Sequence, residues 1–241
     1  MSKTVLGFVG LLALCSFSAS GLTSKAPPKL SNERIIFHTN VGDIVFALFP
    51  EIAPKTTAKI LKLVKAGAYD GVPIGRVEKG FVAQVFNYDA RTTPLTPEQL
   101  KLLGKIPAEF SDIRHTRGIV SLAREDNDIN SGEFSFSFLL GEAPHLDHQY
   151  TVFGEVTQGM DVLSGIENIP TEKTVPIATV MVERAEVVNV DSLNATQLQG
   201  VRMMALPYEK GKFWFEVFAA VMFTLTVATP IYKSIGVRRS T

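Results

Sequence analysis

The chain has 241 residues with 24 basic and 24 acidic side chains, so its formal net charge is zero. Charges of both signs are dispersed and form no basic block, which argues against a nucleic-acid partner. Its single cysteine, Cys15, lies close to the N-terminus. The remainder therefore has no disulfide bonds and depends on an apolar core for its stability.

The first 20 residues are typical of a secretory signal peptide. Lys3 precedes an apolar run over residues 5–14, and small residues follow over 16–21. This order of charge, apolar segment and small residues marks a cleavable signal, and the run is shorter than the about 20 residues that cross a bilayer. We expect residues 1–20 to be removed after about Ser20; the alternative is an N-terminal anchor that remains attached.

Strand signals dominate residues 34–189, which form the expected main domain. Two apolar segments, 34–39 and 43–49, flank Asn40-Val41-Gly42, a pattern that indicates a β-hairpin. Further strands are expected at residues 80–85, 119–123, 134–140, 151–156 and 179–188. Many short strands with few helices favour a mainly β domain, a closed or nearly closed barrel.

Two helices are expected among these strands. The first begins at Pro54 and shows three- and four-residue spacing, with Ala58, Leu61 and Val64 or Lys65 as its repeating positions and Gly67 or Gly71 at its end. The second follows Gly159 and covers residues 160–166. Between the two helices, Thr96 and Pro97 suit the cap and first position of a single helical turn.

The C-terminal part predicts a membrane tether. Residues 190–211 are polar and mixed, as in a stalk, and residues 213–232 are long and apolar enough to span a bilayer. Trp214 and Tyr232 stand at the two ends of the apolar segment, where aromatic rings prefer the headgroup level. With the signal peptide removed, the main domain is lumenal or extracellular and residues 233–241 are cytosolic. Asn194-Ala195-Thr196 is a glycosylation sequon on the lumenal side.

Five segments resemble, in the same order, motifs of the cyclophilins, a family of peptidyl-prolyl isomerases. They are Leu48–Thr56, which ends in Pro-Lys-Thr, then Gly67–Gly71, Ile74–Gln84, His115–Ala123 and Leu146–Val156. The resemblance covers residues 34 to 189. It implies an eight-stranded antiparallel barrel capped by two α-helices, with a peptide groove on its outer face, and a transmembrane helix is expected beyond it.

The resemblance also implies a catalytic set. Arg76 matches the family arginine that stabilises the twisted X-Pro bond, Phe81 the aromatic floor of the proline pocket, and Gln84 the amide that orients the substrate carbonyl. A guanidinium keeps its charge at any relevant pH. No metal and no cofactor is needed for this chemistry.

Substrate-binding positions follow from the same comparison, and several depart from the family pattern. The matching residues are Val82, Ala123, Arg124, Ser135, Ser137, His145, Leu146 and Tyr150. Val82 replaces a methionine, Arg124 an asparagine, Tyr150 a histidine, and His145 a frequent tryptophan. In addition, Gly75 replaces a histidine, and Val85-Phe86-Asn87 replaces Gly-Gly-Asp.

The register around the phenylalanines leaves two alternatives. Without a gap, Ser135 takes the place of the family glutamine and Ser137 that of the pocket phenylalanine. A slip of one residue would instead put Phe138 in the pocket, because such a slip turns every side chain to the other face. The alternation of Phe134, Phe136 and Phe138 favours their placement in the core.

Two other readings of the sequence are weaker. The segment 126–132 resembles the start of a calcium loop, but its glycine comes one place late and Ser137 stands where a glutamate should bind. His145 and His148 have no third metal ligand at a suitable local spacing.

Two functions remain open. The first is a monomeric prolyl isomerase, anchored in a secretory-pathway membrane by its C-terminal helix, that acts on proline-containing polypeptides in the lumen and assists their folding. The second is a peptide-binding or scaffold module that has kept the barrel and lost turnover. Arg76, Phe81 and Gln84 favour the first function, whereas the altered groove positions favour the second.

Overall fold

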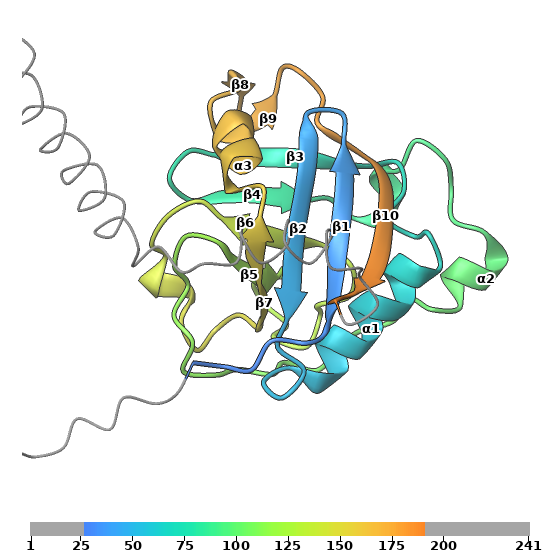
Figure 1. The fold of residues 1–241 in the computed structure, drawn as a ribbon, viewed down its shortest axis with the longest axis vertical. Coiled ribbons are helices and arrows are strands. Elements are labelled where there is room, and N and C mark those ends of the chain that lie inside the picture. The colour runs from blue at the N-terminus through green and yellow to red at the C-terminus, as the bar shows by residue number, and fades with distance from the viewer. Residues whose placement is uncertain (1–26, 191–241) are drawn as a thin grey trace, which may run out of the picture.

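The structure, a computed structural model, describes residues 27–190 (Figure 1). Eight strands close into a barrel in the order β1-β10-β3-β4-β6-β5-β7-β2, and every neighbouring pair is antiparallel. They are β1 (Glu33–Thr39), β2 (Gly42–Leu48), β3 (Val72–Glu78), β4 (Val82–Val85), β5 (Ile119–Leu122), β6 (Phe136–Leu139), β7 (Val152–Gln158) and β10 (Met181–Asn189). The prediction of a mainly β, eight-stranded antiparallel barrel is confirmed.

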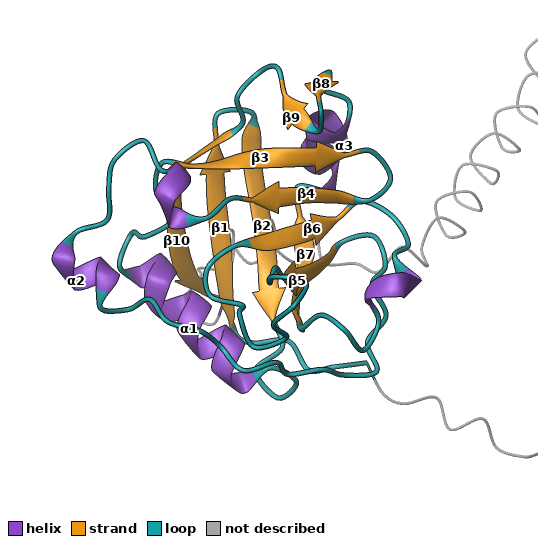
Figure 2. Ribbon diagram, turned by 180° about the vertical axis from the view of Figure 1, so that it is seen from behind, coloured by secondary structure: helices purple, strands orange, loops and turns teal. Residues whose placement is uncertain are grey.

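Two of the helices lie at opposite ends of the barrel (Figures 1 and 2). The helices described are α1 (Pro54–Lys65), α2 (Pro97–Leu100) and α3 (Met160–Glu167), with 3₁₀ helices η1 (Tyr88–Ala90) and η2 (Pro144–Leu146). Figures 1 and 2 show α1 across one end, beside the end of β10, and α3 near the other. The Thr96 side chain caps α2 in a capping box with Gln99, as its sequence predicts. A small hairpin of β8 (Thr171–Glu172) and β9 (Val175–Pro176) follows α3, and the sequence pattern did not reveal it.

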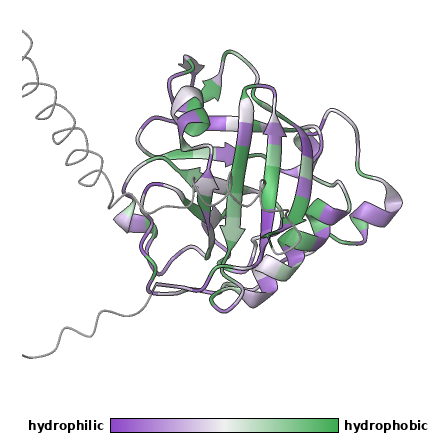
Figure 3. Ribbon diagram, viewed as in Figure 1, coloured by the Kyte–Doolittle hydropathy of each residue, from purple (hydrophilic) through white to green (hydrophobic). Residues whose placement is uncertain are grey.

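Aromatic rings fill the barrel. Phe37, Phe46, Phe136 and Phe138 are fully buried and contact one another at centroid distances of 5.3 to 6.3 Å, mostly edge to face. Such arrangements match the positive edge of one ring with the negative face of another. Figure 3 shows β1 and β2 as mainly hydrophobic between hydrophilic ends, whereas β10 carries hydrophilic and hydrophobic residues along its length. The interior of the barrel is therefore a packed aromatic core.

The buried face of α1 differs from the expected one. Its buried apolar residues are Ile60, Leu63 and Val64, whereas Ala58 is exposed and Leu61 only half-buried. Apolar residues at helical spacing occur on two faces of this helix. The face that packs against the barrel carries the larger side chains, and the lysines of the helix remain in contact with water. The helix ends at Lys65, and Gly67, with a φ of 67°, reverses the chain in a conformation that glycine adopts without strain.

Both ends of the domain emerge at the same end of the barrel, because Glu33 on β1 pairs with Asn189 on β10. Over residues 27–190, the helices are all too short or too polar to cross a membrane. The predicted signal peptide, the stalk from residue 191, Asn194, the membrane helix at 213–232 and the tail lie outside the described residues.

Candidate active site

Four polar side chains form a row across the outer face of the barrel. In the register of the sheet, Arg76 on β3 pairs with Gln84 on β4, Gln84 with Ser137 on β6, and Ser137 with Ser121 on β5. These strands face the viewer in Figure 2. Directly opposed side chains on one face of a sheet lie about 4.5–5.5 Å apart at their Cβ atoms. The barrel therefore brings together residues that are as much as 61 positions apart in the chain.

Arg76 is held by three side chains of its own hairpin. Its Nη2 donates to Glu78 Oε2 at 2.7 Å and its Nη1 to Gln84 Oε1 at 3.4 Å. Its Cζ lies 5.6 Å from the centroid of the Phe81 ring, within the range of a cation–π contact. These contacts orient the guanidinium, and 38% of its side-chain surface remains exposed.

A cavity of about 160 Å³ opens beside this row. The predicted site residues that line it are Arg76, Phe81, Val82, Gln84, Ala123, Arg124, Ser137, Leu146 and Tyr150. His145 lies at the rim, with its ring 5.3 Å from that of Phe81. The sequence comparison thus selected residues from four separate parts of the chain (76–84, 123–124, 137 and 146–150) that share one cavity.

The register around the phenylalanines follows the ungapped alternative. Phe138 pairs with Ala83, is fully buried and contacts the Phe46 ring at 5.5 Å, inside the barrel. Ser137 points outward into the cavity. The alternative with Phe138 in the pocket is therefore wrong, because it would turn the aromatic core to solvent. Phe134 and Phe136 are core residues, as expected.

Arg124 and Tyr150 form one wall of the cavity. The Arg124 guanidinium lies 4.3 Å above the Tyr150 ring and donates to the backbone carbonyls of Gln149, Glu125 and Asp126 at 2.8 to 3.1 Å. The Tyr150 hydroxyl donates to Asp126 at 3.3 Å. The Arg124 side chain therefore links the loop at Glu125 and Asp126 to the loop at Gln149.

Ser135 lies outside this cavity. Its hydroxyl donates to the Val85 carbonyl at 2.7 Å and accepts from Gln84 Nε2 at 3.1 Å. Ser135 thereby fixes the amide of Gln84, and it lines a neighbouring cavity of about 440 Å³. Phe86 also lines this second cavity, and its ring covers Gly75, where an added Cβ would come within 2.4 Å. The glycine that replaces a histidine is thus matched by a phenylalanine that fills the space.

A buried hydrogen-bonded chain lies beneath the site. His115 Nδ1 bonds to Asp147 Oδ1 at 3.0 Å, and His115 Nε2 lies 2.9 Å from Ser121 Oγ. Burial lowers the pKa of His115, although Asp147 opposes the change. The His115 backbone N–H, which donates to the Asp147 carboxylate at 2.8 Å, lowers the pKa of Asp147. Through its two ring nitrogens, His115 ties Ser121 on the floor of the cavity to Asp147, on the loop that carries Leu146.

The described residues, 27–190, hold no cluster of three or more potential metal ligands. In the calcium-like segment, Asp128 binds Lys105 at 2.8 Å and accepts from the Asn130 backbone at 2.9 Å. These contacts lower the pKa of Asp128, and they make the segment a side-chain-stabilised turn.

Comparison with known sequences decides the family. The sequence profile described as "Cyclophilin type peptidyl-prolyl cis-trans isomerase/CLD" matches residues 34–187, well over half of the chain. The chain belongs to the cyclophilin-type peptidyl-prolyl isomerase family. The predictions that it resembles a cyclophilin and is a peptidyl-prolyl cis-trans isomerase are confirmed at this level.

Individual relatives agree with this assignment. "Peptidyl-prolyl cis-trans isomerase CYP23" of Arabidopsis thaliana is 46% identical over 164 residues, which are 67% of this chain and 72% of the relative. A "Probable peptidyl-prolyl cis-trans isomerase" of Brucella suis is 34% identical over 174 residues, which are 68% of this chain and 85% of the relative. The crystal structure of a Cryptosporidium parvum cyclophilin superimposes with a TM-score of 0.57, covering 64% of this chain and 98% of that one. At 24% identity, that structure supports the cyclophilin fold alone.

Some residues that line the cavity of this cyclophilin were not among the predicted site residues. They are Ser121, Leu122, Asp126 and Leu139. Alternation along β6 offers a signal for Leu139, since it shares a face with Ser137. Asp126 lies on a loop whose course only the folded barrel determines.

Proposed function

We propose that this cyclophilin accelerates the cis–trans isomerisation of X-Pro bonds in polypeptides and thereby assists their folding. The observation that carries the proposal is the convergence of Arg76, Phe81 and Gln84 on one cavity. The apolar ring of Phe81 would contact the proline ring. The cation of Arg76 would face the prolyl nitrogen, and the amide of Gln84 would bind the substrate carbonyl.

The chemistry requires only that the twisted bond be held more tightly than the planar one. Amide resonance raises a rotation barrier of about 18–20 kcal/mol, which twisting must overcome. Twisting also localises a lone pair on the prolyl nitrogen, so a donor aimed at that atom favours the twisted state. Arg76 supplies the donor, Phe81 holds the proline ring, and Gln84 binds the carbonyl beside it.

A proline-limited refolding assay with the full-length protein tests the proposal. Catalysed refolding should be faster in proportion to the concentration of this cyclophilin. Unchanged refolding rates, measured alongside an active cyclophilin as a positive control, would contradict the proposal.

A non-catalytic peptide-binding module is the second candidate, and the wall of the cavity favours it. Arg124 is bound to three backbone carbonyls and to Tyr150. It is therefore not available to pair with the substrate backbone, as the asparagine at this position in the family would be. Titration calorimetry with Xaa-Pro peptides distinguishes the two functions. Binding without rate enhancement would support the module.

We also propose that this cyclophilin acts as a monomer in the lumen of the secretory pathway, as a glycoprotein with one membrane span. The signal-like residues 1–20, the sequon at Asn194 and the apolar segment 213–232 support this topology. Because β1 begins beside the end of β10, the chain leaves the barrel at one end, which suits a tether.

Translation in the presence of microsomes tests the topology. The domain should be protected from added protease, and glycosidase should shift its mobility. Digestion of the domain from the cytosolic side would refute the arrangement. Sedimentation of the detergent-solubilised protein, corrected for bound detergent, should give the mass of a single chain.

A further inference from the structure

Glu78 is the only acidic partner that the described residues give to the Arg76 guanidinium. The two residues are two positions apart on β3, so their side chains lie on the same face of the sheet. Arg76 Nη2 and Glu78 Oε2 are 2.7 Å apart, and the two side chains are 38% and 44% exposed. Glu78 does not line the cavity that Arg76 faces. It therefore approaches the guanidinium from outside the substrate space.

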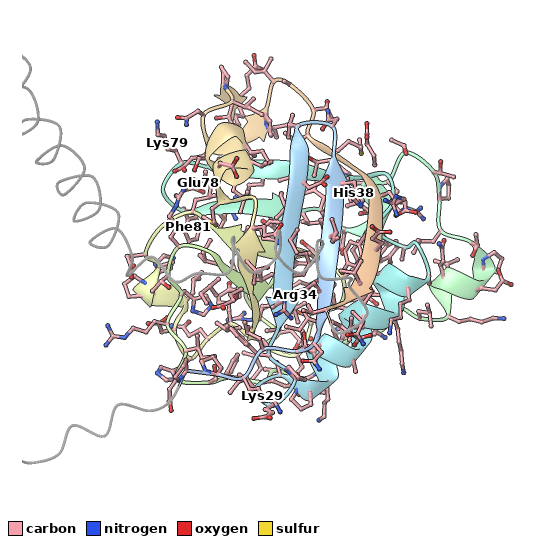
Figure 4. The ribbon with its side chains drawn as sticks, in the orientation of Figure 1. Lys29, Arg34, His38, Glu78, Lys79 and Phe81 are labelled. Atoms are coloured by element: carbon pink, nitrogen blue, oxygen red, sulfur yellow. The ribbon has the colours of Figure 1, made fainter. Side chains whose placement is uncertain are left out.

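The location of Glu78 in the hairpin fixes its backbone. Its Cα pairs with that of Val82, and its carbonyl accepts from the Phe81 N–H at 2.9 Å, which closes the turn. The turn is anchored in addition by Glu167 of α3, which accepts from the Gly80 N–H at 2.9 Å. Figure 4 shows Glu78, Lys79 and Phe81 along the edge of the barrel beside α3. Arg76 is thus paired with a group on an anchored hairpin.

We propose that Glu78 is a positioning residue for isomerisation: its carboxylate locks the plane of the Arg76 guanidinium over the cavity. The inference rests on the proposed isomerase function. An arginine side chain has about 2 kcal/mol of rotamer entropy, and Gln84 at 3.4 Å is a weak restraint by itself. The short ion pair with Glu78 supplies the missing restraint. The N–H groups of the guanidinium that are bonded neither to Glu78 nor to Gln84 can then face the prolyl nitrogen.

The same geometry separates positioning from charge. A carboxylate beside the guanidinium cancels part of its positive charge, so Glu78 weakens any long-range attraction while it fixes direction. If the orientation of the Arg76 guanidinium matters more for catalysis than its net charge, an uncharged hydrogen-bond acceptor at position 78 should support nearly the same activity. Glutamine provides this acceptor through its Oε1, whereas alanine provides none.

The test compares Glu78→Gln, Glu78→Ala and Lys79→Ala in the full-length protein. Lys79 is the matched control, since it adjoins Glu78 but bonds to Asn168 at 3.1 Å. We expect Glu78→Ala to lower kcat/KM by about three- to tenfold, mainly in kcat, because a misdirected donor costs rate more than binding. Glu78→Gln should retain at least half of the activity, and Lys79→Ala should match the wild type.

A second readout does not depend on catalysis. ¹⁵N relaxation of the Arg76 Nε–Hε group should show a rigid side chain in the wild type and Glu78→Gln and a mobile one in Glu78→Ala. Equal mobility in all variants, or a Glu78→Ala enzyme as active as the wild type or more so, would overturn the positioning role. An inactive wild type whose rigid Arg76 side chain becomes mobile in Glu78→Ala would refute the isomerase function and still support the restraint of Arg76 by Glu78.

Discussion

Arg76 and Arg124 both line the cavity, yet their surroundings give them different capacities. The Arg124 guanidinium is bound to backbone carbonyls and covers Tyr150. The Arg76 guanidinium is held by side chains at its edge and remains directed at the cavity. Arg76 is therefore the group that can donate to a substrate, while Arg124 shapes the wall.

Ser137 lines the cavity that we propose to hold the proline ring, and its small side chain leaves that cavity open. It occupies the place of a family phenylalanine and leaves space beside Phe81 and Leu139. Ser137→Phe should fill that space and strengthen the contact with the proline ring. A gain equal to one buried methylene is worth about 0.8 kcal/mol, or roughly fourfold in kcat/KM. Steady-state kinetics on an Xaa-Pro peptide measure it, and a lower kcat/KM in a stably folded variant would contradict this view of the pocket.

His115 should make stability depend on pH. Its side chain is fully buried and its pKa is lowered by burial, so the unfolded chain binds more protons below the usual histidine pKa of about 6.5. The free energy of unfolding should therefore fall as the pH decreases from about 6.5 toward the folded-state pKa of His115. Asp147, with its pKa also lowered, adds a loss at still lower pH, beginning near its unfolded pKa of about 3.9.

Urea denaturation at pH 7.5 and pH 5 measures the dependence on His115. His115→Gln should show a smaller loss of stability between these two values than the wild type. His148→Asn is the control, because His148 is exposed with a φ of 58°, a conformation that asparagine tolerates. The loss of stability of His148→Asn between these pH values should equal that of the wild type. If His115→Gln also lost as much stability as the wild type, His115 would not be the source of the pH dependence.

At the scale of elements, the β3–β4 hairpin shows two sequence departures that compensate for each other. The register between the strands shifts between Ile74 and Arg76, and the Phe86 ring lies against Gly75 at this irregularity. The hairpin retains the course that presents Arg76, Phe81 and Gln84. A sequence comparison shows Gly75 and Phe86 as two unrelated departures from the family. The contact between them shows that the phenylalanine ring fills the space that the glycine leaves.

Gly75→Ala should therefore destabilise the domain. Its Cβ would lie within 2.4 Å of the Phe86 ring, and such overpacking costs about 1–3 kcal/mol. The double variant Gly75→Ala/Phe86→Ala should be less destabilised than the sum of the single variants. A double-mutant cycle by chemical denaturation measures the coupling, and strictly additive values would show that the two residues do not compensate.

For the whole molecule, local sequence signals predicted seven of the eight barrel strands, both capping helices and the Thr96 turn, but they missed β3 (Val72–Glu78), the strand that carries Arg76. Collinear motifs then predicted the barrel and most of the cavity. The rotation of α1 was missed because Ala58 and Leu61 offer the same helical spacing as Ile60, Leu63 and Val64. The register of β6 stayed open because serine and phenylalanine alternate there, and only burial of the rings against β4 and β5 decides it. Contacts such as Arg76–Glu78 and Arg124–Tyr150 depend on side-chain directions, which spacing alone does not specify.

The central claim is that a directed donor on Arg76 catalyses isomerisation, and Arg76→Ala beside Arg76→Lys tests it most directly. Lysine is a flexible point charge and cannot keep the planar contacts of the guanidinium, so it should restore little activity. Losing a preorganised donor costs about 2.7–4 kcal/mol, a factor of about 10²–10³ in rate. In Arg76→Ala, the catalysed contribution to the rate of proline-limited refolding should fall by that factor, towards the uncatalysed rate. Because Arg76 is partly exposed, unfolding free energies should change little. Equal activity in the wild type and both variants would contradict the account.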